Sequence, residues 1–282
     1  MKSQFSARRL WLGVVLCALL PVLMVSRAMA DDDNGKGPKT VDVPIEGKPH
    51  AVAVVYSGDG GWHDLDKVIG EWLGKNGYAV VGVDTLNSFW SSKEPRSVAK
   101  DLKKIVHRID PTDSLPVLIV GYSFGADVFP FAWPELDPAL KSRIQLVSLL
   151  APGYHTAFHV SVEGWLGIDH GDHDVVPAIA ALPAEKVLCV YGSEDKDDTS
   201  CMAPELKQIS VIETSGDHHF DEDYPALAAR INNAFNTKLE SLASQQGGVP
   251  AAASSAKSVA TDAVNPDATT ASVDSTSVKA NE

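Results

Sequence analysis

A serine lies between two glycines in the pentapeptide Gly-Tyr-Ser-Phe-Gly, which runs from Gly121 to Gly125. The apolar run 115–120 precedes it and residues 126–129 follow it, so the pentapeptide is predicted to join a strand to a helix. In that context the pattern is typical of a nucleophile elbow, in which the glycines permit a sharp turn and the serine presents its hydroxyl. Ser123 is therefore the predicted nucleophile, and the alternative is a serine in a tight structural turn.

A serine hydroxyl needs a base to remove its proton and a carboxylate to orient that base. In the α/β-hydrolase order the acid and then the histidine follow the serine along the chain. The segment 215–220 comes after the last strand-like run and contains His218 and His219 in succession. The spacing Gly-x-His-x-Phe selects His218 as the base. For His219, a supporting or packing position is the alternative.

The orienting carboxylate is expected after the strand-like run 187–191. Gly192-Ser193-Glu194-Asp195 follows that run, in the strand-Gly-x-x-Asp arrangement that the acid of this fold usually takes. Asp195 is thus the predicted acid. Asp197 and Asp198 lie close enough to replace it.

An oxyanion hole needs two backbone amides near the nucleophile. One is expected at Phe124, directly after the serine, and the other in the loop 57–62, Ser-Gly-Asp-Gly-Gly-Trp. We assign the second amide to Asp59, with Gly60 next to it. A phosphate-binding glycine loop is the competing interpretation, but no Gly-Lys-Ser/Thr follows.

Four aromatic residues could form walls of a substrate pocket, and they are Trp62, Tyr122, Phe89 and Trp90. The last two follow the second strand, where a rim packed on a helix is an equal alternative. A long insertion, 153–177, also carries histidines and aspartates: His155, His159, His170, His173, Asp169, Asp172 and Asp174. Their spacing matches no dedicated ligand set, so we expect a solvated lid loop, without a metal or another cofactor.

Apolar runs alternate with amphipathic segments across the middle of the chain. Because the strands are continuously apolar and separated by helices, they predict an α/β-hydrolase fold with a mostly parallel central sheet flanked by helices on both faces. Ligands then bind at the carboxyl ends of the strands, where each motif above is placed. Strands are predicted at 51–56, 78–83, 116–120, 145–150, 186–191 and 209–213, and helices at 65–73, 95–109 and 224–239.

The two ends of the chain differ in composition from its middle. Residues 1–30 have a basic start, an apolar run and small residues before Ala30, which predicts a signal peptide cleaved after Ala30 and a periplasmic protein. We expect a flexible leader at 31–39, one domain at 40–240 and a disordered Ala/Ser/Thr-rich tail at 241–282. No transmembrane segment is expected in the mature chain.

Charge and cysteine content limit the partners and suggest a cross-link. Residues 1–30 hold four of the 24 Lys and Arg and none of the 37 Asp and Glu. The net charge of the mature chain is therefore 20 minus 37, or −17. Such a chain will not bind nucleic acid by counterion release, and it favours cationic ligands. Cys189 and Cys201 remain after cleavage, and export permits a disulfide between them, with two free thiols as the alternative.

Together, four motifs resemble the bacterial virulence protein VirJ/AcvB family over residues 51–235. They are 57–62, Asp84 through Phe89-Trp90, 121–128 and 216–220. The resemblance implies a periplasmic serine ester hydrolase with the nucleophile at Ser123 and the base at His218 or His219. It also implies an aminoacyl (lysyl) phosphatidylglycerol or similar lipid ester substrate at the membrane surface. Secretion-system proteins are possible partners, and the competing function is a non-catalytic adaptor or chaperone of type IV secretion.

Overall fold

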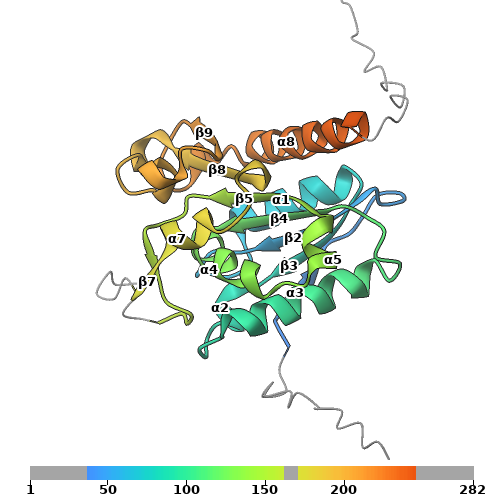
Figure 1. Ribbon diagram of the computed structural model, residues 1–282, viewed down its shortest axis with the longest axis horizontal. Coiled ribbons are helices and arrows are strands. Elements are labelled where there is room, and N and C mark those ends of the chain that lie inside the picture. Colours follow the sequence, from blue (N-terminus) through green and yellow to red (C-terminus); the bar gives the residue numbers. More distant parts are fainter. Residues whose placement is uncertain (1–36, 162–170, 246–282) are drawn as a thin grey trace, which may run out of the picture.

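A computed structural model describes residues 37–161 and 171–245, and their centre is a seven-stranded sheet in the order β1-β3-β2-β4-β5-β8-β9 (Figure 1). Neighbouring strands from β3 to β9 are parallel, and β1 pairs antiparallel with β3 at one edge. The strands are β1 Thr40–Asp42, β2 Ala51–Tyr56, β3 Tyr78–Val83, β4 Val117–Tyr122, β5 Ile144–Leu150, β8 Val187–Gly192 and β9 Ser210–Thr214. A separate two-stranded sheet joins β6 His155–Thr156 to β7 His173–Asp174.

Helices cover both faces of the sheet, because the alternate side chains of each central strand are buried on opposite sides. In β2, Val52, Val54 and Tyr56 pack in a core with helices α3, α4 and α7. Ala51, Ala53 and Val55 pack in a second core with α1 and α8, which lie together on the other side in Figure 1. The helices are α1 Asp64–Lys75, α2 Thr85–Ser88, α3 Pro95–Ile109, α4 Phe124–Ala132, α5 Pro138–Arg143, α7 Val175–Ala180 and α8 Tyr224–Gln245.

Short 3₁₀ helices lie mainly in the second half of the chain, where they connect the last strands. They are Trp133–Glu135, Ala184–Lys186, Ser193–Asp195, Ser200–Met202, Pro204–Leu206 and Phe220–Glu222. The parallel strands place the loops that follow β2, β4, β5, β8 and β9 at one edge of the sheet, which is where the predicted chemistry is concentrated.

The predicted fold class is confirmed, and six strands lie within two residues of their predicted positions. Two boundaries are wrong. Helix α8 continues through Gln245, so 241–245 are helical rather than part of a tail. Lys39, assigned to the leader, donates its amide to Ser88 Oγ at 3.0 Å and accepts from the amide of Asp84 at 2.9 Å, so the ordered chain begins before residue 40.

The predicted signal peptide, most of the predicted leader and the tail from residue 246 lie outside the described residues. Within the described ranges, none of the helices combines the length and the apolar character that crossing a bilayer requires.

Candidate active site

Ser123 occupies a strained turn between β4 and α4. Its backbone angles, φ 50° and ψ −119°, lie in a region that side chains other than glycine rarely adopt. A Cβ at Gly121 would come within 2.7 Å of the carbonyl oxygen of Gly125, and one at Gly125 within 2.6 Å of the carbonyl oxygens of Tyr56 and Ser57. Both flanking glycines are therefore required by the close packing of the turn, as a nucleophile elbow requires.

The loops after β4, β8 and β9 bring a serine, a carboxylate and a histidine into a line of contacts. Nε2 of His218 lies 2.9 Å from Oγ of Ser123, within hydrogen-bond distance. On the other side of the ring, Nδ1 of His218 lies 3.3 Å from Oδ2 of Asp195. The histidine thus joins the hydroxyl to the carboxylate, the order of contacts that a base-activated serine needs.

Among the three aspartates considered for the acid, the structure pairs Asp195 with His218. Asp197 and Asp198 are exposed, and neither has an ion pair to the histidine within the described part of the chain. The loops that carry the acid and the base pack backbone to backbone, since Glu194 donates its amide to the carbonyl of Gly216 at 3.0 Å. A Cβ at Gly192 would collide with this second loop, so the glycine lets the two loops approach.

The ring of His219 contacts Tyr122 rather than the hydroxyl of the serine. Its Nδ1 lies 3.4 Å from the hydroxyl of Tyr122, and its amide donates to Oδ1 of Asp217 at 2.8 Å. Tyr122 also donates to the backbone carbonyl of His218 at 3.3 Å and is almost fully buried. The pair therefore supports the loop that carries His218, as the alternative interpretation of His219 expected.

A disulfide between Cys189 and Cys201 fixes the segment that follows the acid. Cys189 lies inside β8 and Cys201 in the 3₁₀ helix Ser200–Met202, with their Cα atoms 5.6 Å apart and both residues buried. The amide of Ser200 and the hydroxyl of Thr199 both bond to the carbonyl of Pro152, at 3.0 and 3.1 Å. The predicted disulfide is confirmed, and it ties the acid loop to the strand that carries it.

Replacing both cysteines with alanine should lower the free energy of unfolding by about 3 kcal/mol, because the bond closes a loop whose ends are 12 residues apart. Denaturant unfolding of the variant and of the unaltered protein measures the difference. Reduction of the unaltered protein should reproduce the loss. Peptide mass spectrometry without reductant should recover the two cysteine peptides linked, and two freely alkylated thiols would contradict the cross-link.

The loop after β2 is held by a buried hydroxyl network. Ser57 Oγ accepts from the amide of Thr85 at 3.0 Å, and Thr85 Oγ1 donates to the carbonyl of Ser57 at 3.1 Å and to that of Gly58. Both hydroxyl residues are completely buried. This network fixes the backbone directly before Asp59, the residue whose amide was assigned to the oxyanion hole.

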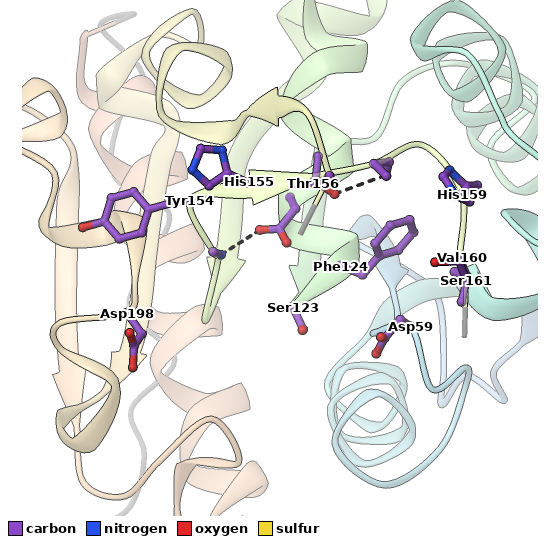
Figure 2. A pocket seen from close by; sticks show the side chains of 14 residues that line it. Asp59, Ser123, Phe124, Tyr154, His155, Thr156, His159, Val160, Ser161 and Asp198 are labelled. Carbon is purple, nitrogen blue, oxygen red and sulfur yellow. Dashed lines mark hydrogen bonds between the residues drawn. The ribbon is translucent and has the colours of Figure 1, made fainter. Parts of the chain in front are cut away.

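A cavity of about 450 Å³ opens beside Ser123 (Figure 2). Phe124 and Asp59, the two predicted oxyanion donors, both line it together with the serine. Its remaining lining comes from α4, from the insertion after β5 and from the acid loop: Asp127, Gly153, Tyr154, His155, Thr156, Ala157, His159, Val160, Ser161, Gly171 and Asp198. The predicted nucleophile and amide donors thus share one cavity.

Two smaller cavities also reach Ser123, and both include His218. One, of about 240 Å³, is bordered by Asp127, Asp195 and Asp198. The other, of about 220 Å³, lies on the side of the loop after β2 and includes Gly60, His219 and Tyr122. A substrate attached to the serine therefore has space on both sides of its reacting carbon.

The structure corrects most of the predicted aromatic walls. Trp62 packs over Gly70 and Gly82, between α1 and β3. Phe89 is buried and packs edge-on against Phe124, with ring centroids 5.3 Å apart.

Trp90 is 65% exposed and lines none of the three cavities described here, whereas Tyr122 borders the smallest of them. Sequence spacing placed all four residues near the sheet edge but could not give the direction of their side chains.

The described part of the insertion after β5 contains regular structure, where a solvated lid loop was expected. Strands β6 and β7 pair within it, and His155 Nδ1 lies 3.1 Å from Asp174 Oδ1. His173 pairs with Asp172, while Asp169 and His170 lie outside the described residues. In the described part of the chain, no group of three or more His, Cys, Asp or Glu is arranged to hold a metal ion.

Comparison with models of protein families identifies the family of this chain. Residues 50–239 match the family described as "Bacterial virulence protein (VirJ)". This chain belongs to the VirJ family. The matched residues 50–239 make up most of the folded domain. Ser123, His218 and Asp195 all lie within this matched range. No curated protein matches this VirJ-family chain.

Solved structures show the fold that the VirJ chain shares with others. It superposes on Est1E from Butyrivibrio proteoclasticus with a TM-score of 0.50 and 14% identity, over 72% of this chain and 99% of that one. It superposes on MenH from S. aureus with a TM-score of 0.51 and 11% identity, over 72% of this chain and 99% of that one. At these identities the likeness establishes the α/β-hydrolase fold alone.

Proposed function

We propose that this protein is a serine ester hydrolase in which Ser123, His218 and Asp195 form the catalytic triad. The observation that carries the proposal is the 2.9 Å contact between His218 Nε2 and Ser123 Oγ at a strained elbow. A strained serine backed by a histidine–carboxylate pair is costly to maintain in a purely structural turn, and it is the arrangement that acyl transfer uses.

The reaction follows from these positions. Ser123 Oγ attacks the ester carbonyl carbon while His218 Nε2 takes the hydroxyl proton, and the amides of Phe124 and Asp59 stabilise the oxyanion. The bond to the alcohol oxygen breaks, and that oxygen receives the proton from His218. Water then adds to the acyl-serine by the same route, which releases the acid and restores Ser123. Asp195 holds the histidine and stabilises its charged form.

The substrate that we propose is an aminoacyl ester of a phospholipid, such as aminoacyl (lysyl) phosphatidylglycerol, hydrolysed at the periplasmic membrane surface. Membership of a family described as bacterial virulence proteins supports a role in the cell envelope or in virulence. The signal peptide predicted from residues 1–30 supports a periplasmic location, with cleavage after Ala30. Secretion-system proteins are the partners that this location would allow.

Labelling with a fluorophosphonate probe tests the class of protein, because only an activated serine reacts with it. The unaltered protein should be labelled, with the modification on the peptide that contains Ser123. Heat-denatured protein is the control and should remain unlabelled. An unlabelled native protein would instead favour the non-catalytic adaptor.

Replacing Asp195 with asparagine should lower kcat/KM for a model ester about 10⁴-fold, since an amide cannot stabilise the charged histidine. Asp197→Asn and Asp198→Asn are matched controls in the same loop, and each should cost far less. Steady-state rates with one ester compare the three variants. If Asp198→Asn were the most damaging, Asp198 rather than Asp195 would be the acid.

A further inference from the structure

Asp127 lies one helical turn after Ser123, at the start of α4. Its amide donates to the carbonyl of Ser123 at 3.0 Å, so the two residues share one face of the turn. Side chains at this spacing have Cβ atoms about 5–6 Å apart. Asp127 borders both the 450 Å³ cavity and the 240 Å³ cavity, and thus lies where the two meet beside the nucleophile.

One carboxylate oxygen of Asp127 accepts a hydrogen bond from the backbone, and the other does not, as far as the structure describes the chain. Oδ1 accepts from the amide of Gly153 at 2.8 Å. Within residues 37–161 and 171–245, Oδ2 has no hydrogen-bond or ion-pair partner. The described lining of the large cavity includes no lysine or arginine and adds the carboxylates of Asp59 and Asp198.

This environment suits a cation. Burial, with a smaller contribution from the charge of Asp59, raises the pKa of Asp127 to about 8. A positively charged ligand beside the carboxylate would lower that pKa again and would be attracted in turn, because opposite charges favour each other's ionised forms. Asp127 does not take part in the proton transfers of the triad, and its hydrogen bond to the amide of Gly153 occupies only one of its two carboxylate oxygens.

The positions of the three cavities relative to His218 indicate which part of a bound substrate lies beside Asp127. The leaving alcohol must lie near His218, which protonates it, and the two smaller cavities include that histidine. The 450 Å³ cavity includes Ser123 and both oxyanion donors, and His218 is not part of its described lining. The acyl group therefore extends into the large cavity. The first acyl atoms after the carbonyl pass the junction where Asp127 lies.

We propose that Asp127 is the specificity-determining residue of this site and that its carboxylate binds the α-ammonium group of an α-amino acyl ester. The inference rests on the proposed ester hydrolysis and assigns a residue that would recognise the amino group of the proposed aminoacyl substrate. In such an ester the ammonium nitrogen is two bonds from the reacting carbon, which matches a carboxylate one helical turn from the nucleophile.

Two esters that differ only in this ammonium group test the proposal: norleucine methyl ester and methyl hexanoate. Asp127→Asn should lower kcat/KM for norleucine methyl ester at least tenfold more than for methyl hexanoate. Comparing the two esters within each variant cancels their intrinsic reactivities. Asp172→Asn is the matched control, because its side chain is 90% exposed and outside the described cavity lining, and it should leave the ratio within about twofold.

A second measurement needs no variant at Asp127. With the unaltered protein, n-butylammonium should inhibit methyl hexanoate hydrolysis at least tenfold more strongly than 1-butanol. Equal inhibition by the two compounds, or an equal effect of Asp127→Asn on both esters, would overturn the proposal while leaving Ser123-dependent hydrolysis intact. If the unaltered protein cleaved neither ester, the proposed hydrolase function would fail as well.

Discussion

Replacing Ser123 with alanine is expected to lower kcat/KM for an ester about 10⁶-fold, down to the level that binding and the oxyanion amides alone support. The reason is that His218 then has no hydroxyl to activate at the end of its 2.9 Å contact. The free energy of unfolding should change by no more than about 1 kcal/mol, since alanine keeps the Cβ and removes one oxygen at the cavity surface.

Steady-state hydrolysis and denaturant unfolding measure the two effects of Ser123→Ala. Ser193→Ala is a suitable control, because Ser193 is exposed at the start of the acid loop and contacts neither the histidine nor the nucleophile. Undiminished turnover by Ser123→Ala would remove the serine from the mechanism, whatever the fold.

Replacing His218 with alanine should cost about as much activity as replacing Ser123, because triad members act as a unit. His219→Ala should cost far less, since its ring contacts Tyr122 rather than the serine hydroxyl. The neighbouring histidines have the same chemistry and differ in position, so each serves as the control for the other.

Rates for the two histidine variants should be compared with their unfolding curves. A loss of stability in His219→Ala without a comparable loss of turnover would agree with its position beside Tyr122. If His219→Ala were the inactive variant, the base would be reassigned, and the 2.9 Å contact would not describe the working site.

Much of the fold could be predicted because the buried strands of a parallel sheet are continuous apolar runs. Ala51–Tyr56 and Tyr78–Val83 were placed to the residue for that reason. The edge strand Thr40–Asp42 was missed, since it is short, mostly exposed and stabilised by pairing with β3 rather than by its own composition. The extension of α8 to Gln245 was missed because its last turn is mostly exposed and has a single large apolar residue, Leu242, among small and polar ones.

The candidate site was predictable where a backbone motif determines the position of a side chain. The residue types around Ser123 and His218 specify turns at known places, and the structure brings these two side chains together. Trp62 and Phe89 were predicted as pocket walls, yet Trp62 is partly buried against α1 and β3 and Phe89 is buried against Phe124, because the direction of each side chain depends on tertiary neighbours.

Asp127 was not singled out, although its spacing of four residues from Ser123 would have placed it on the same helical face. The cavity that it borders depends on residues distant in sequence, such as Gly153 and Asp198, and no local pattern connects them.

Strands β5 and β8 are neighbours in the sheet, but they are separated in sequence by the excursion between Leu150, where β5 ends, and Val187, where β8 begins. Most of the large cavity is built from this excursion, whereas the nucleophile, acid and base come from outside it. Apart from Asp127, Asp59, Phe124 and Asp198, the side chains that line this cavity beside the nucleophile are thus encoded in a different stretch of the gene from the reacting residues. Insertions, deletions or grafts between β5 and β8 could retune which esters fit while the reaction centre is inherited unchanged, which makes this excursion the natural target for altering selectivity.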